Sequence, residues 1–474
     1  MNRDNIWIHV GLATVLVAMA AVLGQIERWK SALHGHEIPV ERSAENPTKR
    51  IKTQDVGTVE VAVRFKPGVS LDRIRVIASA NHDLLKNKIE SVNGLTFIDD
   101  LDNADAKTVA AQYSAMKDVV LYAEPNYQIK LDDPADLASA HDLTDRRFSF
   151  LVPNDPQFGD QWSLNNDGRD GGTKGSDIHA LEAWKKQKGS SDVVVAVLDT
   201  GVDFNHIDLR ENMWIRPENI PQYTDDELGT FNDLNGFNGT DNATDPMDDN
   251  GHGTHCAGII GAEGDNDEGI AGINWHVKIM PLKFLGRGGF GTTDDAIEAI
   301  NYAIDRKKHG VNIRIISASW GSTMRSQALE DTIRAAGDAG ILFVAAAGND
   351  GSDNDRRPHF PSNYNLPNVI SVAALDRNDN LASFSNFGAK TVHIAAPGKD
   401  IRSTWLGDAY REASGTSMAT PEVSGVAALI IASEPSITME KLRQRLLKSV
   451  DKIESLSGKV ASGGRINAAK AVGN

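Results

Sequence analysis

The sequence predicts a three-layer α/β domain with a mostly parallel sheet, preceded by a small α+β domain. From residue 154 onward, runs rich in Val, Ile and Ala alternate with helical segments, the pattern of parallel strands buried on both faces. Shorter strand and helix patterns follow a different order between residues 51 and 133. A length of 474 residues suits two globular units, and 40% hydrophobic with 24% charged residues argues against wholesale disorder.

The N-terminal segment predicts membrane targeting. An apolar run from Ile6 to Gly24 follows a short polar start and precedes charged residues. Small residues such as Ala18 and Ala20 suit cleavage of a signal peptide, while the length of the run also suits a retained anchor. We expect residues 1–24 to be a signal peptide on a secreted or extracytoplasmic protein. The alternatives are an uncleaved anchor, which would leave the protein membrane-anchored, and a buried core helix.

A linker is expected at residues 25–50, and a compact domain at residues 51–133. In that domain TVEVAVRF alternates as a half-buried strand, and LDRIRVIASANH predicts a helix. SVNGLTFID predicts a hairpin around Asn93-Gly94, KTVAAQYSAM a second helix, and VVLYAEPNYQIKL a last strand. This order of strand, helix, two strands, helix and strand is that of a ferredoxin-like α+β unit, a fold that by itself implies no function.

The charge balance disfavours a general nucleic-acid-binding role, because 65 Asp and Glu against 49 Lys and Arg give a net charge of −16.

Residues 134–153 are a polar linker with Asp-Arg-Arg at 145–147, where we expect a processing cut. Residues 217–277 hold thirteen acidic residues and no Lys or Arg, which suits either a solvated surface or a site for a hard cation. Cys256 is the only cysteine, so no intramolecular disulfide can form.

The large domain is expected at residues 154–474. Its expected strands are VVVAVLD, VKIMPLKFL, IRIISASW, ILFVAAAG and VISVAAL. Helices are expected to open at His252 and after Ser417, and to cover AIEAINYAID and ALEDTIRAAGDAG. Ligands of such sheets bind at the carboxyl ends of the strands, so residues at those ends are the first candidates for function.

Three candidates stand at such positions. Asp199 ends an apolar strand, His252 lies in the first turn of a helix, and Ser417 lies at a loop-to-helix junction. Taken singly, each has an ordinary explanation: a turn cap, a capping or metal-binding His, and an N-cap Ser. Taken together, the order Asp, His, Ser on one α/β domain is one of the known orders of a serine-protease triad.

The blocks VVVAVLDTGVD, NGHGTHCAG, AAAGND and SGTSMATP resemble the signature blocks of the subtilase family. The resemblance implies a subtilisin-like serine endopeptidase that hydrolyses peptide bonds through an acyl-enzyme. It implies Ser417 as the nucleophile, His252 as general base and then acid, and Asp199 as the group that orients His252. Asn349, with the Ser417 backbone N–H, would stabilise the oxyanion. The alternative is a catalytically silent relative that acts as a binding protein.

The stretch ending in YAEPNYQI also resembles the end of the inhibitory propeptide of subtilases. The resemblance implies an autoinhibited precursor, a monomer whose partners are protein or peptide substrates and its own propeptide. Substrates would pair as extra strands with two edges. By resemblance these edges are Ser319, Trp320 and Gly321, and the GRGGFG segment around Gly288 and Gly289, for which an ordinary loop is the alternative.

Trp320 is expected to line an apolar subsite. His359 and Phe360 would border the pocket for the residue before the cleaved bond, which implies a broad, apolar-leaning preference unless His359 carries charge. Cys256 follows His252 by four positions, as in the proteinase-K-like branch, and is expected to be a small core residue rather than a nucleophile. Glu422 stands where many subtilases carry His, which bears on helix packing or pH dependence.

Calcium is the cofactor that the resemblance implies, in a structural role. The matching positions are Asp208 in HIDL, Asp265, Asn266 and Asp267 in GDNDEG, and Asp155 in NDPQF. All five offer hard oxygen donors, which suit Ca²⁺ rather than Zn²⁺. The alternative is an acidic surface that binds no metal. A second acidic segment, NATDPMDDNG, would hold another ion or none.

Overall fold

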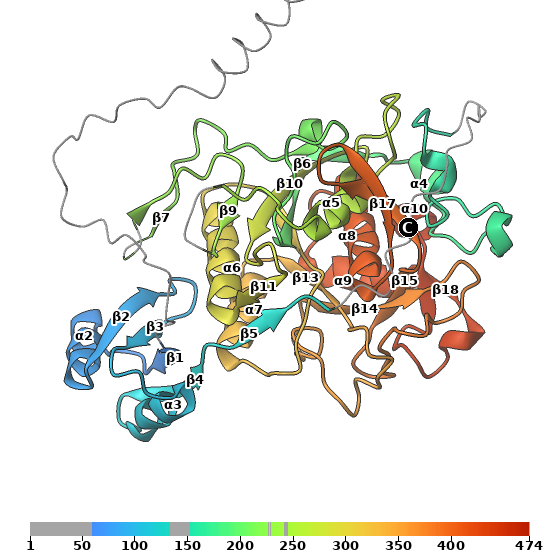
Figure 1. Ribbon diagram of the computed structural model, residues 1–474. Coiled ribbons are helices and arrows are strands. Elements are labelled where there is room, and N and C mark those ends of the chain that lie inside the picture. Colours follow the sequence, from blue (N-terminus) through green and yellow to red (C-terminus); the bar gives the residue numbers. More distant parts are fainter. Residues whose placement is uncertain (1–58, 133–151, 226, 228, 241–244, 474) are drawn as a thin grey trace, which may run out of the picture. The chain divides into compact units, whose positions relative to one another are not determined.

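The computed structural model describes residues 59–132, 152–225, 227, 229–240 and 245–473 (Figure 1). The expected signal peptide or anchor, the linker at 25–50 and nearly all of the expected processing region at 134–153 lie outside these residues. Within the described residues, no helix combines the length and the apolar character needed to cross a membrane.

The small domain contains the expected order of elements. These are β1 (Val59–Phe65), α2 (Leu71–Ala80), β2 (Asp83–Lys88), β3 (Leu95–Asp100), α3 (Ala106–Ala115) and β4 (Val120–Pro125). The strands form a sheet of order β2-β3-β1-β4, and all three pairs of neighbours are antiparallel. Val61 and Val63 of β1 pack in one apolar cluster with Ile74 of α2 and Tyr113 of α3. Both helices therefore cover one face of this sheet, as in a ferredoxin-like unit.

The expected hairpin is present, because β2 and β3 pair antiparallel and the Leu95 N–H donates to the Val92 carbonyl oxygen at 3.0 Å across Asn93 and Gly94. Six residues separate the two strands, and Ile89 and Val92 within that connection are buried.

One expectation for this domain needs correction, since the last strand is not continuous. It breaks after Pro125, and its second part, β5 (Gln128–Lys130), leaves the small sheet to pair with β11 (Phe290–Thr292) of the large domain. The contact with β1 ends one residue after Pro125, where the Asn126 N–H donates to the Glu60 carbonyl oxygen at 3.0 Å.

The large domain is built on the mostly parallel sheet that the sequence predicts. Its nine strands lie in the order β18-β19-β15-β14-β13-β12-β6-β10-β9, and only the edge pair β18–β19 is antiparallel. In chain order they are β6 (Gly189–Asp199), β9 (Phe237–Asn238), β10 (His276–Lys283), β12 (Ile313–Ala318), β13 (Leu342–Ala346), β14 (Val369–Leu375), β15 (Ile394–Pro397), β18 (Val450–Lys452) and β19 (Gly464–Ile466).

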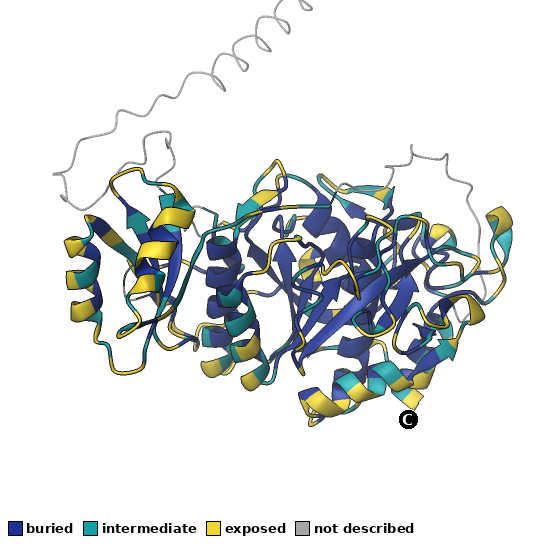
Figure 2. Cartoon of the chain, turned by 90° about the horizontal axis from the view of Figure 1, so that it is seen from below, coloured by how far each residue is buried: buried dark blue, intermediate teal, exposed yellow. Residues whose placement is uncertain are grey.

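Helices cover both faces of this sheet. They are α4 (Ala180–Trp184), α5 (His252–Gly261), α6 (Thr293–Lys308), α7 (Gln327–Asp338), α8 (Thr416–Ser433), α9 (Met439–Lys448) and α10 (Ala468–Gly473). Successive residues of β6 pack on opposite faces of the sheet. Val195 lies in the apolar cluster that contains α5 and α8, and Ala196 lies in the cluster that contains α6 and α7. Figure 2 shows the strands in the buried class and exposed residues on the outer faces of the helices. The remaining paired strands are β7 (Thr224–Asp225) with β8 (Gly229–Thr230), and β16 (Ile401–Trp405) with β17 (Ala409–Ala413).

The order of the strands reverses at β6. The chain continues from β6 to β10 on one side, then returns to β12 on the other side and proceeds to β13, β14 and β15. Crevices at the carboxyl ends of strands at such a switch point are the usual ligand sites of α/β sheets. The carboxyl ends of β6, β12 and β13 carry Asp199, Ser319 and Asn349 respectively, either at the last residue or just beyond it.

Candidate active site

Asp199 and His252 are in direct contact at this end of the sheet. Asp199 Oδ1 lies 2.8 Å from His252 Nδ1 and also accepts a hydrogen bond from the Thr200 backbone N–H at 2.7 Å. Both side chains are buried. Burial lowers the pKa of His252, but the Asp199 carboxylate outweighs burial and raises that pKa above its usual range. The pair can therefore hold a proton on His252 more readily than an isolated imidazole.

The start of α5 is fixed by a residue that the sequence reasoning did not single out. Asp248 Oδ1 accepts from the Gly251 N–H at 3.0 Å and from Thr200 Oγ1 at 2.8 Å, and its Oδ2 accepts from Thr254 Oγ1 at 2.6 Å. Asp248 thus ties the first turn of the helix to the residue after Asp199. The Asp-Asp-Asn-Gly run at residues 248–251, just before His252, is the signal in the sequence for this role.

A close approach between backbones brings His252 to Asp199. A Cβ at Gly253 would lie 2.1 Å from the carbonyl oxygen of Gly201. The helix can therefore press against the loop after β6 only because residue 253 has no side chain.

Ser417 lies in the first turn of α8, where a proline changes the hydrogen bonding. Pro421 stands four residues later and has no N–H, so the Ser417 carbonyl oxygen lacks its usual helical partner. That oxygen accepts from Ser319 Oγ at 2.8 Å and from Cys256 Sγ at 3.5 Å. Ser417 Oγ in turn donates to the Ser319 carbonyl oxygen at 2.9 Å. Among the described residues its hydroxyl makes no hydrogen bond to His252, a contact that often tightens only when substrate is bound.

The Asn349 side chain contacts the start of α8, next to Ser417. Its Oδ1 accepts from the Thr416 N–H at 2.8 Å and from Thr416 Oγ1 at 3.0 Å. A Cβ built on Gly415 would lie 3.3 Å from Asn349 Nδ2 and 3.5 Å from the Ser417 backbone nitrogen. The two N–H donors therefore border one small space next to Ser417, the arrangement needed to bind an oxyanion.

Cys256 lies beneath this group on α5. Its sulfur, a nitrogen of His252 and an oxygen of Asp199 lie within 4.8 Å of one another. Burial raises the pKa of the Cys256 thiol well above its usual value. A thiol that stays protonated is a poor nucleophile, so the structure gives Cys256 the surroundings of a core residue.

The two expected substrate edges are both occupied by the chain itself. In antiparallel register, Lys130 lies opposite Phe290 of β11 on one side and opposite Gly321 on the other. The Leu131 N–H donates to the Gly289 carbonyl oxygen at 2.8 Å. Gly288 lies in the same turn before β11. Residues 128–132, called here the tail, therefore run as a strand between the edges.

Trp320 contributes to the core rather than to an open surface. It is fully buried, its indole N–H donates to the Leu198 carbonyl oxygen at 2.9 Å, and its ring packs against Phe284. It belongs to the same apolar cluster as Ile129 of the tail.

The small domain is held to α6 and α7 by charged groups. Glu124 accepts from Ser326 Oγ at 2.6 Å and from the backbone N–H groups of Gln327 and Ala328 at 2.9 and 3.0 Å, which are at the N-terminus of α7. A carboxylate at this place also meets the positive end of the helix dipole. Further contacts join Arg64 and Tyr122 to Asp331, and Lys86 to Asp294.

Four of the five expected calcium ligands lie close together. Asn266 Nδ2 donates to Asp208 Oδ1 at 3.0 Å, and the Asp265 N–H donates to Asp155 Oδ2 at 2.8 Å. Burial raises the pKa of Asp155 to about 6 and that of Asp208 to about 7. Asp155 Oδ1 is buried without a hydrogen-bond partner among the described residues. A hard cation would stabilise both carboxylates, although among the described residues the oxygens of Asp155, Asp208 and Asp265 do not all lie within 4.8 Å of one another. Asp267 is exposed and bonds to Asn154 through its N–H.

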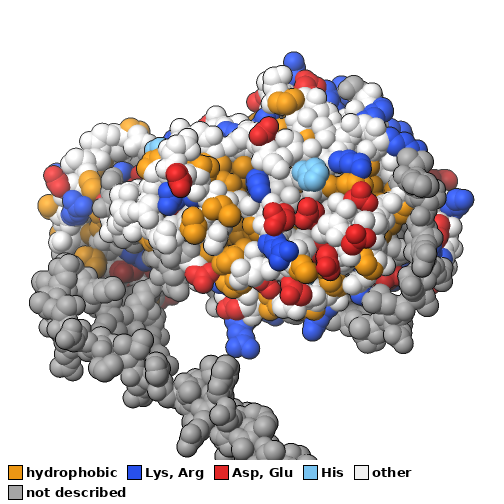
Figure 3. Space-filling model, turned by 90° about the horizontal axis from the view of Figure 1, so that it is seen from above, with side chains coloured by type: hydrophobic (Ala, Val, Ile, Leu, Met, Phe, Trp, Pro, Cys, Tyr) orange, Lys and Arg blue, Asp and Glu red, His pale blue; other side chains and the backbone are white. Residues whose placement is uncertain are grey.

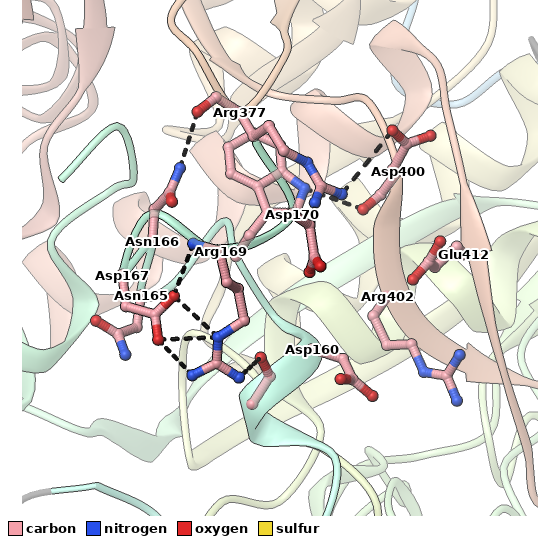
Figure 4. Close-up of a pocket in the computed structure, with 12 residues that line it drawn as sticks. Asp160, Asn165, Asn166, Asp167, Arg169, Asp170, Arg377, Asp400, Arg402 and Glu412 are labelled. Carbon is pink, nitrogen blue, oxygen red and sulfur yellow. Dashed lines mark hydrogen bonds and ion pairs between the residues drawn. The ribbon is translucent and has the colours of Figure 1, made fainter. Parts of the chain in front are cut away.

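A separate polar pocket lies elsewhere on the large domain. Asp160, Asp167, Arg169, Arg377 and Asp400 are among its lining residues, and Arg169 pairs with Asp167 there (Figure 4). No residue of the predicted site lines it. Figure 3 shows acidic side chains gathered over the middle of the face seen from above, with single basic side chains between them, which agrees with the net charge.

Comparisons with known proteins identify the family of this chain. A family model described as the subtilase family matches residues 190–469. A thermophilic serine proteinase of Bacillus sp. (strain AK1) is 35% identical over 421 residues, which are 87% of each chain. Thermitase of Thermoactinomyces vulgaris is 36% identical over 321 residues, 68% of this chain and 99% of that protein. A solved protease from Pseudoalteromonas arctica PAMC 21717 matches with a TM-score of 0.57 and 29% identity, over 68% of this chain and 99% of its own.

Proposed function

This chain belongs to the subtilase family and is a serine-type endopeptidase, and on that basis we propose that Ser417, His252, Asp199 and Asn349 carry out its reaction. The observation that carries the proposal is the space beside Gly415, which both oxyanion donors border next to Ser417. A carbonyl oxygen that becomes negative there would be stabilised by donors already in place.

The mechanism follows from these positions. His252 takes the proton of the Ser417 hydroxyl as that oxygen attacks the substrate carbonyl carbon. Asp199 holds the tautomer of His252 and stabilises the imidazolium, and His252 then gives the proton to the leaving amine. Water hydrolyses the acyl-enzyme by the same steps with His252 as base.

We further propose that the small domain and the tail form an inhibitory propeptide. The supporting observation is that the tail fills both strand edges that a substrate would need. The apolar run at residues 6–24 supports export through a signal peptide. The group of Asp155, Asp208, Asp265 and Asn266 supports a structural calcium ion, which would stabilise the loop after α5 and take no part in bond cleavage.

The proposed residues are tested with the purified mature enzyme. A fluorophosphonate should label it, and it should cleave casein, whereas Ser417→Ala should do neither. Ser433→Ala, at the exposed end of the same helix, is the matched control and should keep both properties. If Ser417→Ala is still labelled and active, the nucleophile is another residue.

The proposed precursor is tested by mass spectrometry. Wild-type protein should lose its N-terminal domain during maturation, and Ser417→Ala should retain it. A wild-type protein that is fully active with residues 59–132 attached would contradict the inhibitory role.

A further inference from the structure

Two buried polar groups meet at the end of the tail. Asp132 Oδ2 lies 3.6 Å from His359 Nε2. The side chain of His359 is 4% exposed and that of Asp132 is 19% exposed. Within the described structure, Asp132 Oδ2 and His359 Nδ1 are buried without a hydrogen-bond partner. Among the ion pairs of the described residues, each of these two groups pairs only with the other.

The register of the tail places Asp132 at the reacting position. Lys130 lies opposite Gly321 in an antiparallel bridge, so Asp132, two residues later, falls opposite Ser319. The carbonyl oxygen of Ser319 is the acceptor of the Ser417 hydroxyl. The tail residue beside the nucleophile is thus Asp132, and a substrate in the same register would present the residue before its cleaved bond there.

His359 is built into the wall of this position. A Cβ at Gly321 would lie 1.9 Å from His359 Cε1, and a Cβ at Gly348 would lie 3.0 Å from His359 Cδ2. The imidazole therefore lies against both backbones, and we call it with Gly321 and Gly348 the His359 subsite. The His359 backbone is also fixed, because its carbonyl oxygen accepts from Ser362 Oγ at 2.7 Å and from the Asn363 N–H at 2.9 Å.

We propose that the His359 subsite selects an acidic side chain, Asp or Glu, before the cleaved bond, and that the precursor is cut between Asp132 and Asp133. An apolar side chain at this place would leave the buried imidazole without a charged neighbour, whereas a carboxylate reaches ion-pair distance of Nε2, as that of Asp132 does at 3.6 Å. The apolar-leaning preference expected from the sequence holds only if His359 carries no charge, and the peptides below decide between the two preferences. The inference rests on the proposed function, because it uses Ser417 as the nucleophile.

The cut balances as an ordinary acyl transfer. Ser417 Oγ bonds to the carbonyl carbon of Asp132, the bond from that carbon to the Asp133 nitrogen breaks, and the proton of Ser417 passes through His252 to the new amine. Water then releases the α-carboxylate of Asp132 and restores Ser417.

The test uses mature enzyme and fluorogenic peptides with the tail sequence Ile-Lys-Leu-X, where X is Asp, Glu, Asn, Leu or Phe. We expect kcat/KM for Asp or Glu to exceed that for Leu by about 10-fold or more, because only an acidic side chain can form the ion pair with His359. His359→Leu should lower the Asp-to-Leu ratio by at least about 10-fold and keep cleavage after Leu. His276→Leu, on an exposed histidine of β10, is the control and should leave the ratio unchanged.

Mass spectrometry of the processed wild-type chain should give Asp133 as the new N-terminus of the first cut, and Asp132→Leu should slow that cut.

Cleavage after Leu or Phe with no preference for Asp or Glu would overturn the inference and leave the proposed function intact. An unchanged ratio in a folded His359→Leu enzyme would also overturn it. If His359→Leu does not fold, the wild-type preference decides alone. No cleavage of any peptide, together with no fluorophosphonate labelling, would overturn the proposed function and this inference with it.

Discussion

Asp199 Oδ1 lies 2.8 Å from Nδ1 of His252, and neither residue is exposed to more than a small extent. Asp199→Asn should leave this geometry intact but favour the wrong tautomer of His252. We expect kcat to fall by about 10⁴ with little change in KM. Steady-state kinetics on a good peptide substrate would measure this. Asp192→Asn, on an exposed part of β6, is the control, and a loss below 10-fold for Asp199→Asn would contradict the assigned role.

Asn349→Ala should remove one of the two oxyanion donors and leave the other. The expected result is a fall in kcat of about 10² to 10³, again with little change in KM, because the donor acts on charge that develops only in the transition state. The same kinetic assay measures it. A rise in KM at constant kcat would instead indicate a role in substrate binding.

Glu422→Gln tests a buried acid on α8. Burial raises the pKa of Glu422 to about 8, above its ordinary value of 4.5 and against a smaller opposing effect of Ser163. The folded state therefore binds the Glu422 proton more tightly than the unfolded state does. This binding adds fully to the free energy of unfolding below pH 4.5, and the added free energy is lost as pH rises through 8. Above that pH, Glu422→Gln should be more stable than wild type by roughly 3 to 5 kcal/mol, with little difference at pH 4.5.

Denaturant unfolding at pH 4.5 and 9 measures this effect, in a Ser417→Ala background that prevents self-digestion. The exposed Glu218→Gln is the control and should follow wild type at both values. A difference between Glu422→Gln and wild type that does not change with pH would show that packing, rather than ionisation, is responsible.

Glu124→Ala should weaken the hold of the small domain on α7. It removes three hydrogen bonds to the helix N-terminus, and we expect a loss of roughly 1 to 3 kcal/mol. The delay between the first cut of the precursor and full peptidase activity should therefore shorten, by about 5-fold or more. A time course of activity and chain length measures it. The exposed Asp72→Ala should keep the wild-type delay, and an equal delay in Glu124→Ala would rule out this contact as a restraint.

Calcium should raise the melting temperature of the enzyme relative to chelator, by roughly 5 to 10 °C at about 100 times its Kd. Asp208→Asn removes one charged donor from the group that includes Asp155, and should abolish most of this shift. Differential scanning calorimetry with and without chelator measures it, again in the Ser417→Ala background. An equal shift in wild type and Asp208→Asn would place the ion elsewhere.

The sequence predicts most of the fold and the positions of Asp199, His252 and Ser417, because a strand end and a helix start are local patterns. Other contacts depend on distant segments. Glu124 meets Ser326 across two hundred residues, and no local signal marks either of them as partners. The path of the tail was also not predictable, since a run of apolar and polar residues does not say which sheet it will join.

Gly321 and His359 depend on each other in the proposed substrate edge, because a Cβ at residue 321 would overlap the imidazole. Any larger residue at 321 would displace the imidazole and disturb the strand edge in the same event. A smaller residue at 359 would clear the Gly321 backbone, so under the proposed function a change of cleavage preference is expected to begin at residue 359 while glycine at 321 is retained.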